Sequence, residues 1–234
     1  MKLVIGLLAC CSKENYMQQI LTCEATWCKS SIIPIHYFTG QNCPNKVCNN
    51  NVVHLPNVGD DVLSATYKQW YGLRWLYDKY PDAEFYYLAG TDTYAKIDKI
   101  LEYLNTLDSK ENLYIGGHGW IRTATGKEVY YHSGGSGFIL SNSLMKNIYD
   151  FIPEWINIWN LHTEWIRVAC DWSIAELFLY KNINVKTISL NTFKACNFKG
   201  IGKNGIVCCN NVDSKKDWVF HYMDLKDMIE LYQS

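Results

Sequence analysis

Residues 86–98 read YYLAGTDTYAKID, and they join a short apolar strand to a single acid at its tip. The apolar run ends on Gly90, and Asp92 follows it between two threonines. Residues 97–107 then carry apolar side chains at helical spacing. In parallel α/β sheets, ligands bind at the carboxyl ends of the strands. This position is compatible with a functional role for Asp92 and equally with an ordinary turn aspartate after a glycine.

Segments of strand and helix character alternate on both sides of this stretch. Strands are predicted at residues 3–9, 32–40, 51–55, 84–90 and 185–190, and helices at 15–27, 59–80, 97–107 and from about 171 onward. This order predicts an α/β fold with a mostly parallel, Rossmann-like central sheet flanked by helices. No linker or internal repeat divides the chain, so we expect a single domain over residues 1–234.

Residues 113–141 have a different character. They predict two strands around a turn at Thr125 to Lys127, a glycine cluster, and then a helix capped by Ser141. The cluster consists of Gly134, Gly135 and Gly137. Such glycines let the backbone approach a ligand closely, and a hairpin with a flexible return is the alternative. Neither common phosphate-loop fingerprint is present.

The composition excludes some partners and favours others. Twenty-two basic residues stand against 23 acidic ones, a formal charge of −1, so we expect no nucleic-acid partner. The 9 Trp, 17 Tyr and 8 Phe form a rich aromatic supply that mostly fills the core but also suits sugar-binding clefts. Trp120 and Trp172 are candidates for stacking on a sugar, with core placement as the default.

Ten cysteines are too few for a disulfide scaffold. No C-x-x-C pair occurs, so a structural zinc site is a weak hypothesis. Bridges between Cys43 and Cys48, or from Cys196 to Cys208 or Cys209, are compatible with an oxidising compartment, and free buried thiols are the alternative.

The first residues, MKLVIGLLACC, have the outline of a short signal peptide, but we favour a buried first strand because no small-x-small cleavage site follows. No other segment approaches the roughly 18 apolar residues of a membrane span, so we expect a soluble protein. Asp60 and Asp61 resemble a catalytic pair, but their place before a helix predicts an N-cap and a first-turn acid.

Five stretches in order carry a family resemblance: EATWCKSSIIPIHYFTG, DKYPDAEFYYLAGTDTYAKIDKI, SGGSGFILS, CDWSIAELF and FHYM. Together they resemble the fringe and core-1 β1,3-galactosyltransferase group of inverting glycosyltransferases, and the resemblance covers nearly the whole chain. It implies the GT-A fold, a UDP-sugar donor, and a hydroxyl of a glycan or glycoprotein as acceptor.

The resemblance also implies roles for individual residues. Asp92 and His221 would bind a divalent metal, usually Mn²⁺, and Asp171 would be the general base. Donor contacts would come from Gly90, Thr91, Asp92, Gly134, Gly135 and Gly137. Oxygen and imidazole ligands suit manganese better than a thiolate-rich zinc site would. His118 and His132, which flank the glycines, are weaker candidates for contacts with donor or acceptor.

The chain departs from the family pattern at two places. Gly90 and Thr91 stand where the family has the first two acids of a triplet, and Cys170 replaces the first of a double acid. These departures motivate an alternative function, a carbohydrate- or nucleotide-binding module without turnover. A retaining transferase or a nucleotidyltransferase is a third hypothesis.

Further alternatives stay open for single residues and for the compartment. Asp171 could be only an N-cap, His221 a core histidine, and Glu176 the base in a different register. The membrane anchor usual in Golgi members is absent from this sequence, which is compatible with part of a longer protein or with a protein that works outside the Golgi. We expect a cytoplasmic protein, in the host cytoplasm if viral. The lumen of the secretory pathway is the alternative.

Overall fold

The computed structural model describes residues 1–29, 32–41, 51–123 and 126–234. Its centre is a seven-stranded sheet with the strand order β10-β6-β9-β4-β1-β2-β3. The strands are β1 (Leu3–Leu8), β2 (Ile35–Thr39), β3 (Val52–His54), β4 (Phe85–Gly90), β6 (Leu113–Gly116), β9 (Phe138–Ser141) and β10 (Lys186–Ser189). Neighbouring strands run parallel except where β9 pairs with β4 and β6. The predicted mostly parallel sheet is therefore present.

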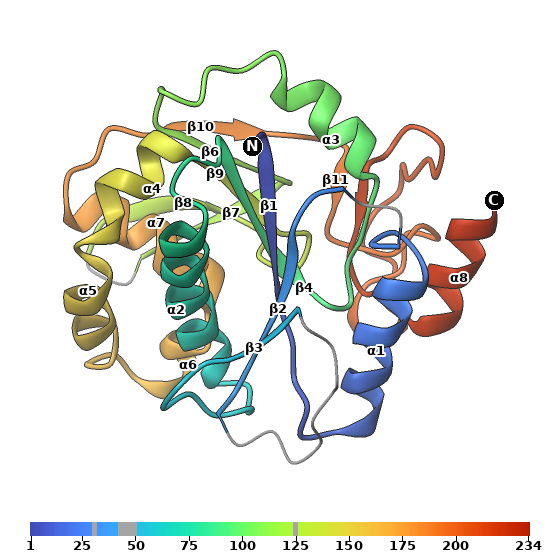
Figure 1. Cartoon of the computed structure of the whole chain (residues 1–234), viewed down its shortest axis with the longest axis horizontal. Coiled ribbons are helices and arrows are strands. Elements are labelled where there is room, and N and C mark those ends of the chain that lie inside the picture. The colour runs from blue at the N-terminus through green and yellow to red at the C-terminus, as the bar shows by residue number, and fades with distance from the viewer. Residues whose placement is uncertain (30–31, 42–50, 124–125) are drawn as a thin grey trace.

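Helices cover both faces of this sheet. They are α1 (Glu14–Ala25), α2 (Ser64–Lys79), α3 (Ile97–Leu104), α4 (Asn142–Tyr149), α5 (Ile152–Trp159), α6 (Glu164–Arg167), α7 (Cys170–Tyr180) and α8 (Leu225–Gln233). Figure 1 shows α2, α4, α5 and α7 on one side of the strands, and α1, α3 and α8 on the other. The result is the three-layer arrangement that alternating strands and helices predict.

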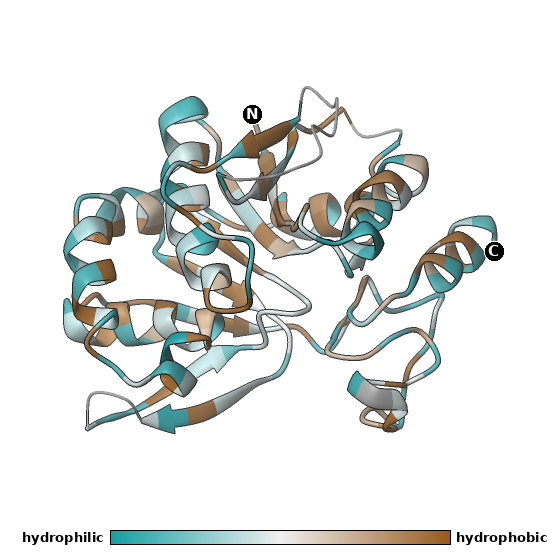
Figure 2. Ribbon diagram, turned by 90° about the horizontal axis from the view of Figure 1, so that it is seen from below, coloured by the Kyte–Doolittle hydropathy of each residue, from teal (hydrophilic) through white to brown (hydrophobic). Residues whose placement is uncertain are grey.

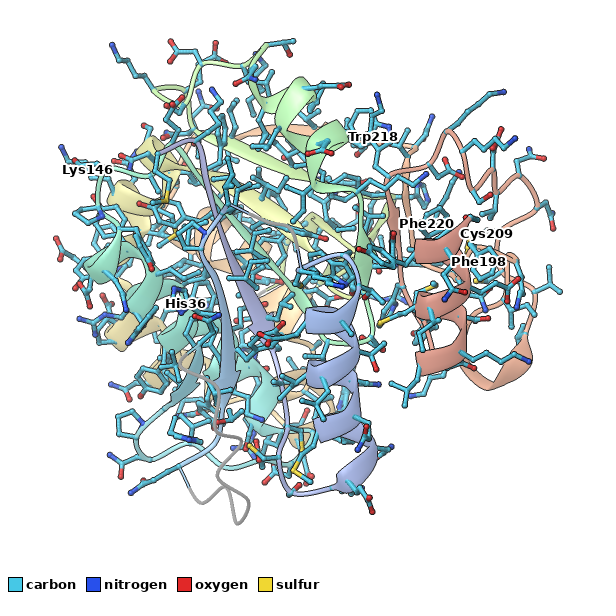
Figure 3. The ribbon with its side chains drawn as sticks, turned by 45° about the vertical axis from the view of Figure 1, so that its right-hand side comes forward. His36, Lys146, Phe198, Cys209, Trp218 and Phe220 are labelled. Atoms are coloured by element: carbon cyan, nitrogen blue, oxygen red, sulfur yellow. A yellow bond between two sulfur atoms is a disulfide. The ribbon has the colours of Figure 1, made fainter. Side chains whose placement is uncertain are left out.

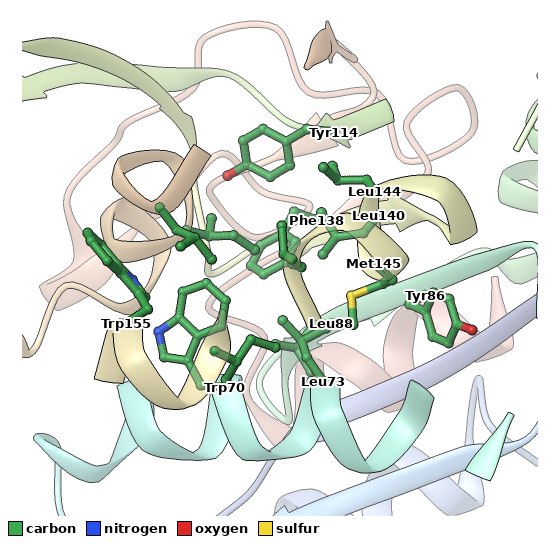
Figure 4. Close-up of a cluster of buried hydrophobic side chains, with 14 of the residues drawn as sticks. Trp70, Leu73, Tyr86, Leu88, Tyr114, Phe138, Leu140, Leu144, Met145 and Trp155 are labelled. Carbon is green, nitrogen blue, oxygen red and sulfur yellow. The ribbon is translucent and has the colours of Figure 1, made fainter. Parts of the chain in front are cut away.

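A separate apolar cluster fills the space on each side of the sheet. On the α2 side, Trp70, Leu73 and Trp155 are fully buried against Phe138 (Figure 4). The indole N–H groups of Trp70 and Trp155 both donate to the hydroxyl of Ser173, at 2.9 and 3.1 Å. These bonds satisfy the polar edges of two large rings, so the rings can be buried at little polar cost.

The strands owe their position to continuous apolar sequence. Residues 3–8 and 85–90 are buried along most of their length, as strands covered on both faces must be. Figure 2 shows brown, apolar segments along the central strands and teal, polar turns on the outer faces of the helices. No helix in the described part of the chain is long and apolar enough to cross a membrane.

Two small sheets lie beside the central one. The first is the hairpin of β7 (Gly119–Thr123) and β8 (Glu128–His132), as predicted, although residues 124–125 of its turn lie outside the described residues. The second has the order β11-β12-β5, from β11 (Phe193–Lys194), β12 (Val219–Phe220) and β5 (Tyr94–Ala95). It joins the C-terminal segment, residues 193–234, to the residues that follow β4.

The C-terminal segment carries Phe198 and Cys209, which lie beside α8 in Figure 3. A disulfide joins Cys196 to Cys209, one of the bridges that the sequence allowed. Cys43 and Cys48, the other predicted pair, lie outside the described residues. A short 3-10 helix, η1 (Lys203–Gly205), stands between the two bridged cysteines.

The sequence interpretation was wrong about residues 113–141 in two respects. They hold strand β6 before the hairpin, and strand β9 between the glycine cluster and the helix that Ser141 caps. The four residues of β9 run directly into the helix that Ser141 caps, so no turn residue marks them as a separate strand. Because β9 is antiparallel to its neighbours, its first residues lie at the carboxyl edge of the parallel strands. The glycine cluster thereby reaches the same edge as Asp92.

Candidate active site

The side chains of Asp92 and His221 meet at the carboxyl edge of the sheet. Oδ2 of Asp92 lies 3.2 Å from Nε2 of His221. The carboxylate is one third exposed and the imidazole only 11% exposed, so the pair faces solvent mainly through the acid. The sequence resemblance predicted that these two residues act together, and the structure brings them into contact.

The register of the small sheet explains this contact. Strands β12 and β5 pair antiparallel, with Phe220 opposite Tyr94. The chain that follows Phe220 therefore lies alongside the residues that precede Tyr94, and Asp92 is one of them. The N–H of Met223 donates to the carbonyl of Asp92 at 2.9 Å and closes the arrangement. The apolar pair at positions 94 and 220 thus sets the place of the polar pair.

Gly135 lies directly against the imidazole of His221. A Cβ at position 135 would be only 1.9 Å from Cε1 of the ring, so no other residue type fits without displacing it. The hydroxyl of Thr93 donates to the carbonyl of Gly135 at 2.6 Å. The glycine loop is therefore anchored to the segment that carries Asp92.

Asp171 lies on the other side of the same loop. Its Oδ2 accepts the N–H of Gly134 at 3.0 Å, and its Oδ1 accepts the N–H of Trp172 at 2.9 Å. A Cβ on Gly134 would be 2.7 Å from the Cβ of Asp171. Two adjacent glycines thus separate the Asp92–His221 pair from Asp171, each fitted to one of them.

Asp171 is not the N-cap of its helix. The N-cap of α7 is Ala169, and Asp171 is in the first turn with its carboxylate directed to Gly134. Burial raises the pKa of Asp171, while the two N–H donors and the nearby His221 oppose that rise. A carboxyl group with a raised pKa binds a proton more readily than an exposed aspartate does.

The remaining predicted donor contacts differ in character. Gly90 is close to Asp92, because a Cβ there would be 2.7 Å from the carboxylate oxygen. Thr91 is buried and its hydroxyl donates to the side chain of Gln19, so its hydroxyl already has a partner. Gly137 is buried with φ +77°, and a Cβ would contact Tyr87 at 2.5 Å. The backbone conformation at position 137 therefore requires a glycine.

A cleft of about 570 Å³ opens beside Asp92. It lies between the carboxyl ends of β1 and β4 and the beginnings of α1 and α2. Its lining includes Tyr16, Gln19, Asp60, Lys68, Thr91 and Asp92. This volume falls in the range of about 300–1,000 Å³ typical of small-ligand sites.

The cleft contains an ion pair that the sequence analysis missed. Asp60 accepts the N–H groups of Cys11 and Gly40 at 2.8 and 2.9 Å, and the Nζ of Lys68 contacts its carboxylate. Lys68 also donates to the carbonyl of Ala9 at 2.7 Å. Both side chains are less than 10% exposed. Burial opposes the charge on Asp60, but Lys68 and the two N–H donors hold its pKa below the usual range.

The prediction for the acid pair before α2 was therefore wrong, because the N-cap of α2 is Leu63 and no acid lies in the first turn. Asp61 lies just before the helix and accepts both the N–H and the hydroxyl of Ser64, the first helical residue, each at 2.8 Å. Asp60 instead ties three separate segments together. All its backbone partners are distant in sequence, so no local pattern could have distinguished it from its neighbour.

Tyr222 is the second residue that sequence reasoning missed. Its backbone has φ +56°, a conformation that bulky residues rarely adopt. Its ring stacks on that of His221, with centroids 3.7 Å apart and planes at 30°. Nδ1 of His221 is buried with no hydrogen-bond partner among the described residues. The stack and Asp92 therefore set the orientation of the imidazole.

Other candidates from the sequence are structural. His132 is fully buried between the carbonyls of Gly117 and Tyr114, and burial lowers its pKa. Glu176 is fully buried and accepts the indole N–H of Trp172 at 3.2 Å. His118 is exposed at the hairpin.

Aromatic rings continue from Asp171 to the surface. Trp172 is buried, and its ring lies 6.3 Å from that of Trp165, which is 69% exposed. Tyr131 stacks over Trp172 at 6.5 Å and pairs across the hairpin with Trp120, which is 54% exposed. An amphipathic aromatic surface thus borders the acid.

Comparison with known proteins found similarities to this chain in sequence and in fold. No family model matches the chain. The chain is 28% identical to chondroitin sulfate synthase 3 over 165 residues of the Mus musculus protein and 163 residues of the Homo sapiens protein. Each match covers 65% of this chain, which spans only 18% of the length of these relatives.

Solved structures share the fold over almost the whole chain. A glycosyltransferase involved in the glycosylation of the major capsid of PBCV-1 superposes with a TM-score of 0.58 and 12% identity, covering all of both chains. The glycosyltransferase GlyE of Streptococcus pneumoniae gives 0.51 at 11% identity, over 96% of this chain and 55% of that one. Mouse xyloside xylosyltransferase 1 gives 0.51 at 8% identity, over 94% and 97%. The predicted GT-A-type α/β fold is confirmed.

Proposed function

We propose that this protein transfers a sugar from a UDP-sugar donor to a hydroxyl of a glycan or glycoprotein, with inversion of the anomeric centre. The narrower assignment, to a fringe-like group, rests on the five sequence stretches. The observation that carries the proposal is the contact of 3.2 Å between Asp92 and His221, which the adjacent Gly134 and Gly135 separate from Asp171.

A divalent cation fits the Asp92–His221 pair. Two ligand atoms that bind one cation at about 2.1 Å and at right angles lie about 3.0 Å apart, close to the 3.2 Å between Oδ2 and Nε2. One carboxylate oxygen and one imidazole nitrogen form a donor set suited to Mn²⁺. When bound, the ion would stabilise the negative charge that grows on the departing diphosphate.

Asp171 is proposed as the general base. An acceptor hydroxyl is a poor nucleophile, so a carboxylate within hydrogen-bond reach must take its proton as it attacks the anomeric carbon. Asp171 is held in place by Gly134 and Trp172, and its pKa is raised by burial. The fixed position and the raised pKa both favour transfer of the acceptor's proton to Asp171. In this proposal the base and the cation ligands would lie on opposite sides of the transferred sugar, with the glycine loop between them.

The cleft beside Asp92 is proposed as the nucleoside site. It opens at the carboxyl ends of β1 and β4, and Asp92 lies on its rim, so a nucleotide there would direct its phosphates to the Asp92–His221 pair. Tyr16, on α1, presents a partly exposed ring for a base to stack on. The uridine identity of the base rests on the family resemblance alone.

The aromatic surface around Asp171 supports a saccharide acceptor. Trp165 and Trp120 are both more than half exposed. The ring of Trp165 lies beside that of Trp172, and Trp120 is opposite Tyr131, whose ring stacks on Trp172. Flat amphipathic rings cover the apolar faces of sugars. An acceptor sugar bound to this surface would place a hydroxyl close to Asp171.

A binding module without turnover is the second candidate, favoured by three observations. Gly90 offers no carboxylate where the family has an acid, and Thr91 is already bonded to Gln19. Cys170 does not replace the missing acid of the second motif, because burial raises its pKa to about 12.

The proposed compartment is the cytoplasm, with the secretory lumen as the alternative that the Cys196–Cys209 bridge favours.

Release of UDP from a panel of UDP-sugars, with Mn²⁺ and with a chelator, tests the two candidates. We expect metal-dependent release that falls at least 100-fold in Asp171→Asn and in Asp92→Ala. Asp82→Ala, at an exposed acid remote from the cleft, is the matched control and should leave the rate unchanged. Trp165→Ala should weaken acceptor binding and leave donor hydrolysis intact.

Donor binding without release in the wild type would favour the binding module. Release that persists in Asp171→Asn and in Asp92→Ala would contradict the proposed transferase site. The anomeric configuration of the product, read by NMR, tests inversion separately.

A further inference from the structure

Three sulfur atoms converge in the C-terminal segment, outside the candidate active site. The Sγ atoms of Cys196, Cys208 and Cys209 all lie within 4.8 Å of one another. Cys196 and Cys209 form the disulfide, and Cys208 is a free, exposed thiol with its sulfur 3.9 Å from that of Cys209. The described residues hold no other such cluster of three metal-ligating side chains.

Hydrogen bonds hold together the two ends of the loop from Cys196 to Cys209, independently of the bridge. The carbonyl of Gly200 accepts the N–H groups of Cys208 and Cys209 at 3.0 and 3.4 Å. The N–H of Gly202 donates to the carbonyl of Ile206 at 2.7 Å, and Ile201 forms a β-bridge with Val207. The backbone thus brings residues 208–209 back to the start of the loop.

The beginning of the loop is anchored to α8 as well. The side-chain oxygen of Asn197 accepts the N–H groups of Lys199 and Ile201, and its amide donates to Asp227 at 2.9 Å. Lys199 pairs with the same acid at 2.8 Å. A loop held by this many contacts should stay folded after reduction, with its three thiols still close together.

We propose that the reduced loop is a binding site for one thiophilic divalent cation, Zn²⁺, with Cys196, Cys208 and Cys209 as ligands. Thiolates at about 2.3 Å from a tetrahedral zinc lie about 3.8 Å apart, and the Cys208 and Cys209 sulfurs are already 3.9 Å apart. Water takes the fourth position, because Cys208 is open to solvent.

The site and the disulfide exclude one another. A dithiol reductant first converts the Cys196–Cys209 bridge to two thiols and is itself oxidised to a disulfide, a transfer of two electrons and two protons. Zinc then binds three thiolates, and the three thiol protons leave to solvent. The redox state of the surroundings therefore decides which form of the loop exists.

The position of this site gives it a link to the candidate active site. The carbonyl of Cys196 accepts the N–H of His221 at 3.0 Å. The two sites differ in ligand type, sulfur in one and oxygen with nitrogen in the other, so they select different ions. The zinc proposal does not depend on sugar transfer.

Metal titration of the reduced protein tests the proposal. The protein is reduced, freed of reductant under anaerobic conditions, and titrated with Co²⁺ and then Zn²⁺. We expect one equivalent of Co²⁺ with a thiolate charge-transfer band, displaced by Zn²⁺. The protein with its bridge intact should bind at least tenfold more weakly.

Cys208→Ser is the decisive variant, because an exposed thiol can be replaced without disturbing the core, and its affinity should fall at least tenfold. A Cys11→Ser/Cys43→Ser/Cys48→Ser background removes other thiols that reduction could expose, and should bind as the wild type does. Thermal melting verifies that each variant is folded. Absence of a thiolate band in the reduced wild type, or equal affinity in Cys208→Ser, overturns the proposal.

Discussion

Oδ2 of Asp92 lies 3.2 Å from Nε2 of His221, although one follows a central strand and the other is close to the carboxyl terminus. Their contact depends on the pairing of Tyr94 with Phe220. The space behind the imidazole depends on Gly135. A small hydrophobic sheet and one glycine thus hold the pair in place, and substitution at the glycine is the sharpest way to disturb it.

Gly135→Ala should displace the imidazole of His221, because the new Cβ would lie 1.9 Å from Cε1. We expect Mn²⁺ affinity in the presence of UDP to fall at least tenfold, with the fold retained. Electron paramagnetic resonance of free Mn²⁺ during titration measures this affinity, and circular dichroism reports the fold.

Gly134→Ala is the matched partner, since its Cβ would instead meet the Cβ of Asp171 at 2.7 Å. We expect this variant to keep its Mn²⁺ affinity and to lose at least tenfold in kcat, because the base moves and the cation ligands do not. Equal effects of the two alanines on metal affinity would contradict the division of the glycine loop between two partners.

The buried pair of Lys68 and Asp60 should be important for stability. Lys68→Met removes the cation and leaves a carboxylate that is only 9% exposed, so the free energy of unfolding should fall by about 3–5 kcal/mol. Urea denaturation of Lys68→Met, Asp60→Asn and the double variant measures the loss. The double variant should recover part of it, because no buried charge is left without a partner. Additive losses would argue against an unpaired charge as the cause.

The sequence predicted those parts of the molecule that local patterns encode. Continuous apolar runs identified β1 and β4, and the order of five motifs identified Asp92, Asp171 and His221 as residues that belong together. The structure shows Asp92 in contact with His221, whereas the catalytic and metal-binding roles of all three residues are proposals.

What the sequence could not predict depends on tertiary geometry. Asp60 differs from Asp61 through its pairing with Lys68 and through N–H donors from Cys11 and Gly40, which lie far along the chain. The positive φ of Tyr222 is imposed on both sides by long-range bonds, from the N–H of His221 to Cys196 and from that of Met223 to Asp92. No local propensity favours a left-handed tyrosine.

Tyr222 should position the imidazole of His221 through their stacked rings. Tyr222→Phe keeps the stack and should bind Mn²⁺ with UDP as the wild type does. Tyr222→Gly relieves the backbone strain, worth about 1–3 kcal/mol, but removes the ring, so metal affinity should fall several-fold without a matching loss of stability. Tyr222→Ala, which keeps the strain and loses the ring, separates the two effects. If all three variants bind Mn²⁺ equally, the stack has no positioning role.

Stability of the metal-free protein should carry the signature of Asp171 in its pH dependence. Burial raises the pKa of this carboxyl above the ordinary value of 3.8, so the folded protein holds the proton more tightly than the unfolded chain does. The contribution of Asp171 to stability is therefore complete below the unfolded-state pKa and is lost as pH rises through the folded-state pKa. Asp171→Asn lacks this loss. The free energy of unfolding of the variant minus that of the wild type should therefore increase with pH above about 4 and then level off.

Urea denaturation at a series of pH values, in chelator, measures this difference in the free energy of unfolding. For the control variant Asp82→Asn, at an exposed acid, the difference should not change with pH. A difference that falls as pH rises would mean that the hydrogen bonds from Gly134 and Trp172 outweigh burial, leaving Asp171 an ordinary carboxylate rather than a tuned base.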